Sequence, residues 1–324
     1  MMKRLVPLLI ALPVLSLVAL SLGAAEVDQL TRYLFNPFFD TWSPSHQIIW
    51  EIRAPRVAAA LLVGAALGIA GSLAQSSTNN PLADPAILGT SAGASLGVLL
   101  GVLTNVVTIG SVESVICAAI GALAATLMTF SLARSALQLI TIGIGVSAIL
   151  NAIVGLTITA ISRPDARSIS FWSFGSLSLV TEKNIAIVAP VLAIGSIFAW
   201  KIAPRLDLLS LGDSSVRHMG YSAFRIRLAA FAVLATLVAV TVSTVGSIAF
   251  LALAAPHIAR YLCGPRNRNL VIFAGVIGAL ILLIADTAAR SILPPYELPI
   301  GLLTSLLGAP ILIATLKRSG DVWR

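Results

Sequence analysis

Residues 57–76 read VAAALLVGAALGIAGSLAQS, a run that contains no charged residue. A helix needs about 20 mostly apolar residues to cross the hydrocarbon core of a bilayer, and this run supplies them. Nine further apolar stretches are separated by polar or proline-rich breaks. The predicted spans cover residues 5–22, 57–76, 87–104, 112–132, 139–161, 185–203, 227–245, 248–262, 271–289 and 299–316. The sequence therefore predicts an all-α, polytopic membrane protein with about ten transmembrane helices.

The composition of the whole chain agrees with this fold class. Hydrophobic residues make up 58% of the chain and charged residues 10%, and the mean hydropathy is +0.98. A soluble domain carries about 25% charged residues, so lipid has to cover much of this apolar surface. We expect a single transmembrane domain over residues 1–324.

The positive charges predict the orientation of the chain. With ten spans and a cytoplasmic start, 14 of the lysines and arginines fall on the cytoplasmic side and seven on the outer side. We therefore expect both termini in the cytoplasm of a cell whose cytoplasmic membrane holds the protein. The net charge of +8 then reflects topology rather than nucleic-acid binding. Arg53, Arg56 and Arg290 lie on the outer side against this bias.

The first apolar run has two interpretations. Lys3 and Arg4 precede residues 5–22, and Gly23 with the two alanines after it resembles a cleavage region for a signal peptide. The run is long for the apolar core of a signal peptide and sufficient for a span, so we favour a retained first helix.

Irregular features are expected at three places. Residues 168–180 are too short to cross and predict a half-helix, Gly246 marks a break after the seventh span, and Pro256 is expected to interrupt the eighth. Glycines repeat every four residues on two spans, a spacing that lets helix backbones approach closely in lipid. These glycines are Gly64, Gly68, Gly89, Gly93, Gly97 and Gly101.

The chain has no sign of an energy source of its own. None of its four lysines follows a glycine, so a phosphate-binding Gly-Lys-Ser/Thr loop is absent. Asp286 is the one carboxylate well inside a predicted span, and Arg290 at i+4 offers it a local ion pair. Cys117 and Cys263 form no metal or redox spacing. Transport is therefore either passive or driven by a partner.

Several motifs in order resemble the FecCD-type permeases of ABC importers for iron chelates and cobalamin. The resemblance covers nearly the whole chain and rests on residues 52–56 (IRAPR), 71–75 (GSLAQ), 80–85 (NPLADP), 88–89 (LG), 208–213 (LLSLGD), 219–220 (MG), 256–260 (PHIAR), 285–290 (ADTAAR), 297–301 (ELPIG) and 308–310 (GAP). The chain departs from the family pattern at Ala252, Ala254, Ala255 and Leu312, which are positions of packing character.

This resemblance implies a fold like that of the cobalamin-importer permease and a set of partners. The permease would pair with a second copy or a paralogue, and two cytoplasmic ATPase subunits would bind ATP and Mg²⁺, leaving this chain without a cofactor. An extracytoplasmic binding protein would deliver the cargo. Ferric siderophore is the first expectation for the cargo, haem and cobalamin remain open, and an ion-coupled carrier or passive channel is the rival function.

The resemblance also implies roles for individual residues. Arg53, Arg56 and Arg290, which we place near the outer surface, would meet carboxylates on the binding protein. The cytoplasmic loop 204–225 would carry a short coupling helix between Gly212 and Gly220, with Leu211 beside it. Asp213 is a candidate cap for that helix. The expected cytoplasmic gate consists of Asn80 and Leu82 with a second constriction at Ala136 and Leu137, and Asn151 on the fifth span is the candidate for lining the pathway.

Overall fold

The computed structural model describes residues 2–319 apart from 24, 26, 29, 37–39, 87, 110, 134, 161–171 and 295. Helices joined by turns account for the described residues, which contain no strand. The helices are α1 (Met2–Ser21), α2 (Leu30–Phe35), α3 (Pro44–His46), η1 (Gln47–Arg53, a π-helix), α4 (Ala54–Thr78), α5 (Thr90–Leu103), α6 (Val112–Leu132), α7 (Ala136–Ala160), α9 (Glu182–Leu209), α10 (Asp213–His218), α11 (Ala223–Val245), α12 (Leu251–Cys263), α13 (Asn267–Ser291) and α14 (Ile300–Ser319).

Every predicted span overlaps one of these helices, so the all-α membrane fold is confirmed. Within the described residues, seven helical segments are long and apolar enough to cross a membrane. The remaining predicted spans correspond to α5, α12 and α14. The 13 residues of α12 extend only about 20 Å, less than the roughly 30 Å of a hydrocarbon core. Part of this path through the membrane is therefore not helical.

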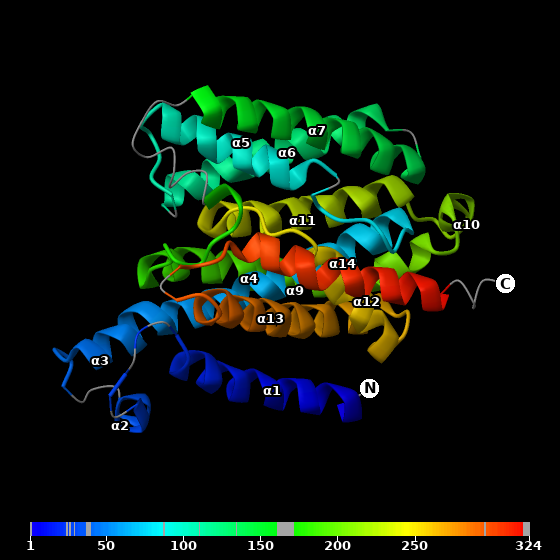
Figure 1. The fold of residues 1–324 in the computed structure, drawn as a ribbon. Helices are drawn as coiled ribbons and strands as arrows, with labels where there is room; N and C mark the ends of the chain where they lie inside the picture. The colour runs from blue at the N-terminus through cyan, green and yellow to red at the C-terminus, as the bar shows by residue number, and fades with distance from the viewer. Residues whose placement is uncertain are drawn as a thin grey trace.

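The helices form a bundle with a central helix and exposed flanks. α5, α6 and α7 lie along one side, α1 lies along the opposite side, and α4, α9 and α11 run between them (Figure 1). The start of α1, the end of α14 and α10 lie at one end of the bundle, and α2 and α3 lie at the other (Figure 1). We call these the inner and outer ends, because the charge bias predicts the first to be cytoplasmic.

Small residues bring α4 against its neighbours. Of its apolar window 78% is buried, against 6% for α1 and 22% for α7. A Cβ added at Gly64 or Gly68 would overlap the backbone of α13, and one added at Gly93 or Gly97 would overlap the backbone of α6. The close approach predicted from the glycine spacing is therefore confirmed at these positions.

Of the three irregular features, one is confirmed, one is wrong and one lies partly outside the described residues. Gly246 does end α11, with φ of +75°. Pro256, however, lies inside a continuous α12, so the expected interruption is wrong. Proline frees the carbonyl group four residues earlier, on Ala252, and Gly71 of α4 packs directly against that oxygen. The half-helix predicted over 168–180 lies partly outside the described residues; residues 172–173 are helical, and residues 174–180 form turns.

Candidate functional site

A buried cluster of charges joins α4 to α13 at the outer end. The Arg56 Nε donates to Asp286 Oδ1 over 2.7 Å, and Arg56 Nη1 donates to Glu297 Oε1 over 2.8 Å. Arg290 Nε lies 3.5 Å from Asp286 Oδ2, which confirms the ion pair expected from the i+4 spacing. Asp286 is fully buried, whereas the Glu297 side chain is 36% exposed. The cluster contains two arginines and two carboxylates, so its charges balance within the chain.

At the outer end, two arginines also bind the last carbonyl groups of α1. Arg53 donates to the carbonyl oxygens of Leu20 and Ser21 over 2.8 and 2.9 Å and to that of Ala25 over 2.6 Å. Arg290 donates to the carbonyl oxygen of Ala19. Carbonyl groups at a helix C-terminus lack partners within the helix and carry partial negative charge, so cations stabilise them. The folded chain therefore uses the first apolar run as a helix that is bound to the bundle.

The three outer arginines are not at the surface, contrary to their expected placement. Arg53, Arg56 and Arg290 are only 4%, 5% and 5% exposed. Their donors are directed at carboxylates and carbonyl groups of this chain. A docking role for these arginines stays a prediction, and it would require an existing contact to be exchanged. Glu297 had no partner assigned from the sequence, although Arg53 and Arg56 were two outer arginines without an assigned carboxylate.

The inner loop has the short helix that was expected between two glycines. α10 occupies residues 213–218, and Gly212 and Gly220 flank it with φ of +85° and +80°. α9 continues to Leu209 and α11 begins at Ala223, so the connection is shorter than the predicted 204–225. Leu211 and Gly212 are exposed or half-buried, and nothing lies within 4 Å of a Cβ added at Gly212 or Gly220. α10 is thus accessible at the inner end.

The expected capping role of Asp213 is wrong. Gly212 occupies the cap position, and the Asp213 carboxylate instead accepts two hydrogen bonds from Arg227, over 2.8 and 2.7 Å. The hydrogen bonds from Arg227 lower the pKa of Asp213. Arg227 also donates to the carbonyl oxygen of Ser77, at the end of α4. Through this arginine α10 is connected to the central helix as well as to α11.

The connection between α4 and α5 contains the first pair of predicted gate residues. Asn79 ends α4 in a left-handed conformation and donates to the Leu209 carbonyl oxygen over 2.8 Å, so the connection touches the end of α9. Asn80 Oδ1 accepts from the Leu82 backbone N–H, and the Leu82 side chain is exposed. Asp84 is buried, accepts from the Ala86 N–H over 2.7 Å, and burial raises its pKa to about 6.

The second pair of gate residues and the pathway residue lie on α7. Leu137 is exposed near the start of the helix, while the side chain of Ala136 lies outside the described residues. Asn151 is also exposed, in the middle of the helix. Apolar side chains surround it on the exposed face, among them Ile144 and Leu156. α7 therefore presents a mostly apolar face with one amide, which this chain leaves uncovered.

Within the described residues, no three His, Cys, Asp or Glu side chains come together in a way that could hold a metal ion. The carboxylate inside the membrane, Asp286, is already paired with arginine. The clearest arrangements in the chain are therefore a closed charge cluster at one end and an accessible helix at the other.

Comparison with known proteins gives one consistent result. The profile of the FecCD transport family matches residues 8–318. The chain is 33% identical to the iron(3+)-hydroxamate import system permease protein FhuB of Bacillus subtilis (strain 168), a match that covers 93% of this chain and 79% of the relative. It is also 33% identical to the hemin transport system permease protein HmuU of Yersinia pestis, over 94% of each chain.

A solved structure has the same fold along its whole length. This chain matches a metal-chelate-type ABC transporter in an inward-facing conformation with a TM-score of 0.87 and 27% identity. The match covers 98% of this chain and 100% of the other.

Proposed function

Because this chain belongs to the FecCD transport family, it is the multi-pass permease subunit of an ATP-binding-cassette importer, and we propose that its cargo is a ferric siderophore. The observation that carries this function is the unbroken family match over residues 8–318. The paired state of Asp286 counts against an ion-coupled carrier, since such a carrier needs a carboxylate that is free to bind its ion.

The choice of cargo rests on the relatives. FhuB is named for iron(3+)-hydroxamate and HmuU for hemin, so the same fold is compatible with either chelate. We take ferric siderophore as the cargo and haem as the second candidate. The test is uptake of radioactive iron into proteoliposomes that contain the permease, its ATPase and its binding protein. Uptake of hemin but not of ferric hydroxamate would reject the siderophore assignment.

We propose that the binding protein docks at the outer end by exchanging one carboxylate for another. Arg56 already binds Glu297, which is the half-exposed member of the cluster. A carboxylate of the partner would take the place of Glu297 on Arg56. Glu297 precedes α14 by three residues, and Leu298 and Ile300 donate to the carbonyl oxygens of Ala289 and Gly175. Displacement of Glu297 would therefore act on the start of α14.

The exchange can be tested without removing an arginine. Glu297→Gln removes the competing carboxylate and leaves Arg56 paired with Asp286. We expect faster association of the binding protein, measured by surface plasmon resonance at low and high salt. Wild-type kinetics in this variant would reject the exchange. In a separate test, the charge reversal Arg53→Glu with Arg56→Glu should impair transport chiefly by weakening docking, and its folding is checked by size-exclusion chromatography. Wild-type binding kinetics in a folded double variant would contradict a docking role for these arginines.

At the inner end we propose that α10 is the coupling helix that contacts an ATPase subunit. The complex would contain two such subunits, which bind ATP and Mg²⁺. The open space around Gly212 and the exposed Leu211 and Asp213 support this role, since a partner can reach all three. Gly212→Val should uncouple ATP hydrolysis from uptake while the bundle stays folded. Unchanged uptake, with unchanged stimulation of ATP hydrolysis by the loaded binding protein, would reject the assignment.

We further propose that α7 faces a second permease across the transport pathway. Its uncovered face, with Asn151 at the middle, supports this position. Leu82 and Leu137 would then close the pathway at the inner end against the same residues of the second chain. Cysteine pairs at position 137 in an otherwise cysteine-free chain should crosslink between two permeases in the absence of cargo, and a lack of crosslinking in every nucleotide state would contradict the gate.

A further inference from the structure

An apolar groove and a polar cavity follow one another along the same three helices. The groove has a volume of 620 Å³ and is lined by α4, α9 and α13, with Leu12 of α1 at its edge. The cavity has a volume of 700 Å³ and lies where α4 and α9 end and α13 begins, together with the last turn of α12. Both hollows therefore lie along a single path that leads toward the inner end.

The helix faces that line the apolar groove also line the polar cavity. Ile69 and Trp200 line the groove, and Ser76 and Asp207 line the cavity. Each polar residue follows its apolar counterpart by seven positions, which is about two helical turns and so the same helix face. On α13 the groove residue Ile272 follows Arg268 by four positions, again on one face. The groove is thus apolar at membrane depth and becomes polar near the inner end.

Positive charge lies beside Trp200, the groove residue on α9 that is nearest in sequence to the cavity. The guanidinium carbon of Arg268 lies 4.0 Å from the centre of the Trp200 ring. Lys201 is the next residue on α9, and both cations are exposed. No described residue accepts a hydrogen bond from Arg268. The Asp207 carboxylate nearby is occupied by the backbone and side-chain N–H groups of Asn267, over 2.9 and 2.8 Å. Tryptophan is enriched at membrane–water interfaces and arginine in cytoplasmic loops, so both residue types suit a position near the inner interface.

We propose that this groove binds an anionic phospholipid. One acyl chain lies along α4, α9 and α13, and the phosphate lies against Arg268 and Lys201. Apolar side chains match the acyl chain, and two exposed cations at the interfacial end match the phosphate. The proposal does not depend on the cargo or on the docking mechanism.

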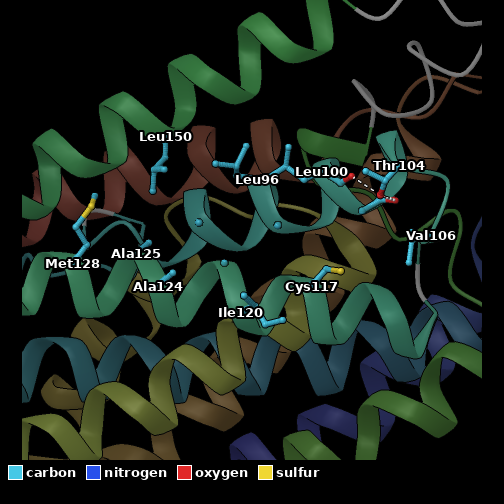
Figure 2. A pocket seen from close by; sticks show the side chains of 14 residues that line it. Leu96, Leu100, Thr104, Val106, Cys117, Ile120, Ala124, Ala125, Met128 and Leu150 are labelled. Atoms are coloured by element: carbon cyan, nitrogen blue, oxygen red, sulfur yellow. Dashed lines mark hydrogen bonds between the residues drawn. The ribbon is translucent and has the colours of Figure 1, made fainter.

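A second groove provides an internal comparison. It has a volume of 480 Å³ and lies between α5, α6 and α7, with Leu96, Ile120 and Leu150 pointing into it (Figure 2). No charged residue lines it, and Thr104 and Val106 mark one end (Figure 2). An acyl chain fits its chemistry, but a charged head group has no partner there. Only the groove beside Trp200 is expected to distinguish anionic from neutral lipids.

The test is native mass spectrometry of the full chain, exchanged into phosphatidylglycerol or phosphatidylcholine. The wild type should retain phosphatidylglycerol preferentially. Each of Arg268→Gln and Lys201→Gln should reduce that preference about fivefold, while Lys183→Gln, at the other end of α9, should leave it unchanged. Val276→Phe fills the apolar part and should reduce retention of both lipids.

Three outcomes would overturn the proposal. The first is equal retention of both lipids by the wild type, and the second is an unchanged preference in the double variant Lys201→Gln, Arg268→Gln. The third is displacement of bound phosphatidylglycerol by inorganic phosphate, which would show an anion site without an acyl-chain component. Arg268→Lys keeps the charge and should retain most of the preference, which separates loss of charge from a failure to fold.

Discussion

Arginines and glycines have different surroundings at the outer and inner ends of the bundle. At the outer end Arg53, Arg56 and Arg290 are buried and bound within the chain. At the inner end Arg227 binds the exposed Asp213. A Cβ at Gly246 would overlap the carbonyl oxygen of Trp172, whereas one at Gly212 would meet nothing within 4 Å.

The polar groups of the outer end are therefore bound within the chain, whereas the inner end has residues that a partner protein can reach. The outer end satisfies its charges internally and packs backbone against backbone. The inner end has a short helix, α10, between two glycines, and nothing among the described residues lies within 4 Å of a Cβ added at either glycine. A substitution at the outer end should therefore affect folding first, and one at the inner end should affect coupling first.

The largest effect should come from the two glycines compared directly. Gly246→Ala combines a positive φ with a backbone collision, so the loss of stability should exceed the roughly 4–5 kcal/mol that few single substitutions reach. Gly212→Ala has a similar positive φ but open space, and should lose only about 1–3 kcal/mol. Thermal unfolding in detergent measures both. Equal losses would show that the backbone strain shared by both glycines accounts for the effect and that packing does not distinguish the two ends.

The next largest effect is expected at the buried cluster. Asp286→Asn leaves Arg56 and Arg290 without their shared carboxylate, and breaking a buried pair in this way costs about 3–5 kcal/mol. The melting temperature should fall well below that of Glu297→Gln, whose carboxylate is partly solvated. If both variants melt together, the cluster does not depend on Asp286.

A smaller effect on stability should depend on pH. It tests whether Asp84 is a buried titrating group near the inner end. The folded-state pKa of Asp84 is raised from 3.8 to about 6, so the folded chain binds the proton more tightly than the unfolded chain. Its contribution to stability is present at low pH and is lost as pH rises through 6. From pH 7.5 to 5 the wild type should gain about 1.4 kcal/mol from this group. Asp84→Asn should remove that gain, and a gain that persists in the variant would assign it to other groups.

The smallest effect is expected at the exposed pair. Asp213→Asn weakens an ion pair whose carboxylate is in water, so the loss should stay below about 1 kcal/mol and shrink further in high salt. Because the pKa of Asp213 is lowered, its contribution holds at neutral pH and disappears as pH falls through the folded-state value. A loss as large as that of Asp286→Asn would remove the contrast between the two ends.

Much of the fold could be predicted because it follows from local patterns. Apolar runs predicted the spans, glycine spacing predicted that α4 approaches a neighbouring helix closely, and Gly212 and Gly220 predicted α10 between them. The family motifs named the residues of both ends. Each of these signals lies within a short stretch of sequence.

The interactions that could not be predicted join residues far apart in the sequence. Arg56 and Asp286 are separated by 230 positions, and nothing in one sequence pairs them. A surface position for the arginines followed from counting charges per loop, which says nothing about depth. Asp213 fits the cap position by residue type, but Arg227 on the next helix competes for its carboxylate. Pro256 lies inside a continuous helix, and the carbonyl group that it frees lies against Gly71, which is 185 positions earlier in the sequence.

The sequence separation of Arg56 from Asp286 also determines how long Arg56 is without its partner during synthesis. A ribosome adds about 5–20 residues per second, so the 230 positions between them take roughly 10–50 seconds. During that interval α4 is in the membrane with its arginine unmatched, and α1 has its contacts with η1 and α4 but lacks Arg290 and the packing against α13. The nascent chain must keep this arginine near water or near the insertion machinery until α13 emerges. Slowing translation between these two helices would lengthen the period in which the half-made permease is open to proteolysis.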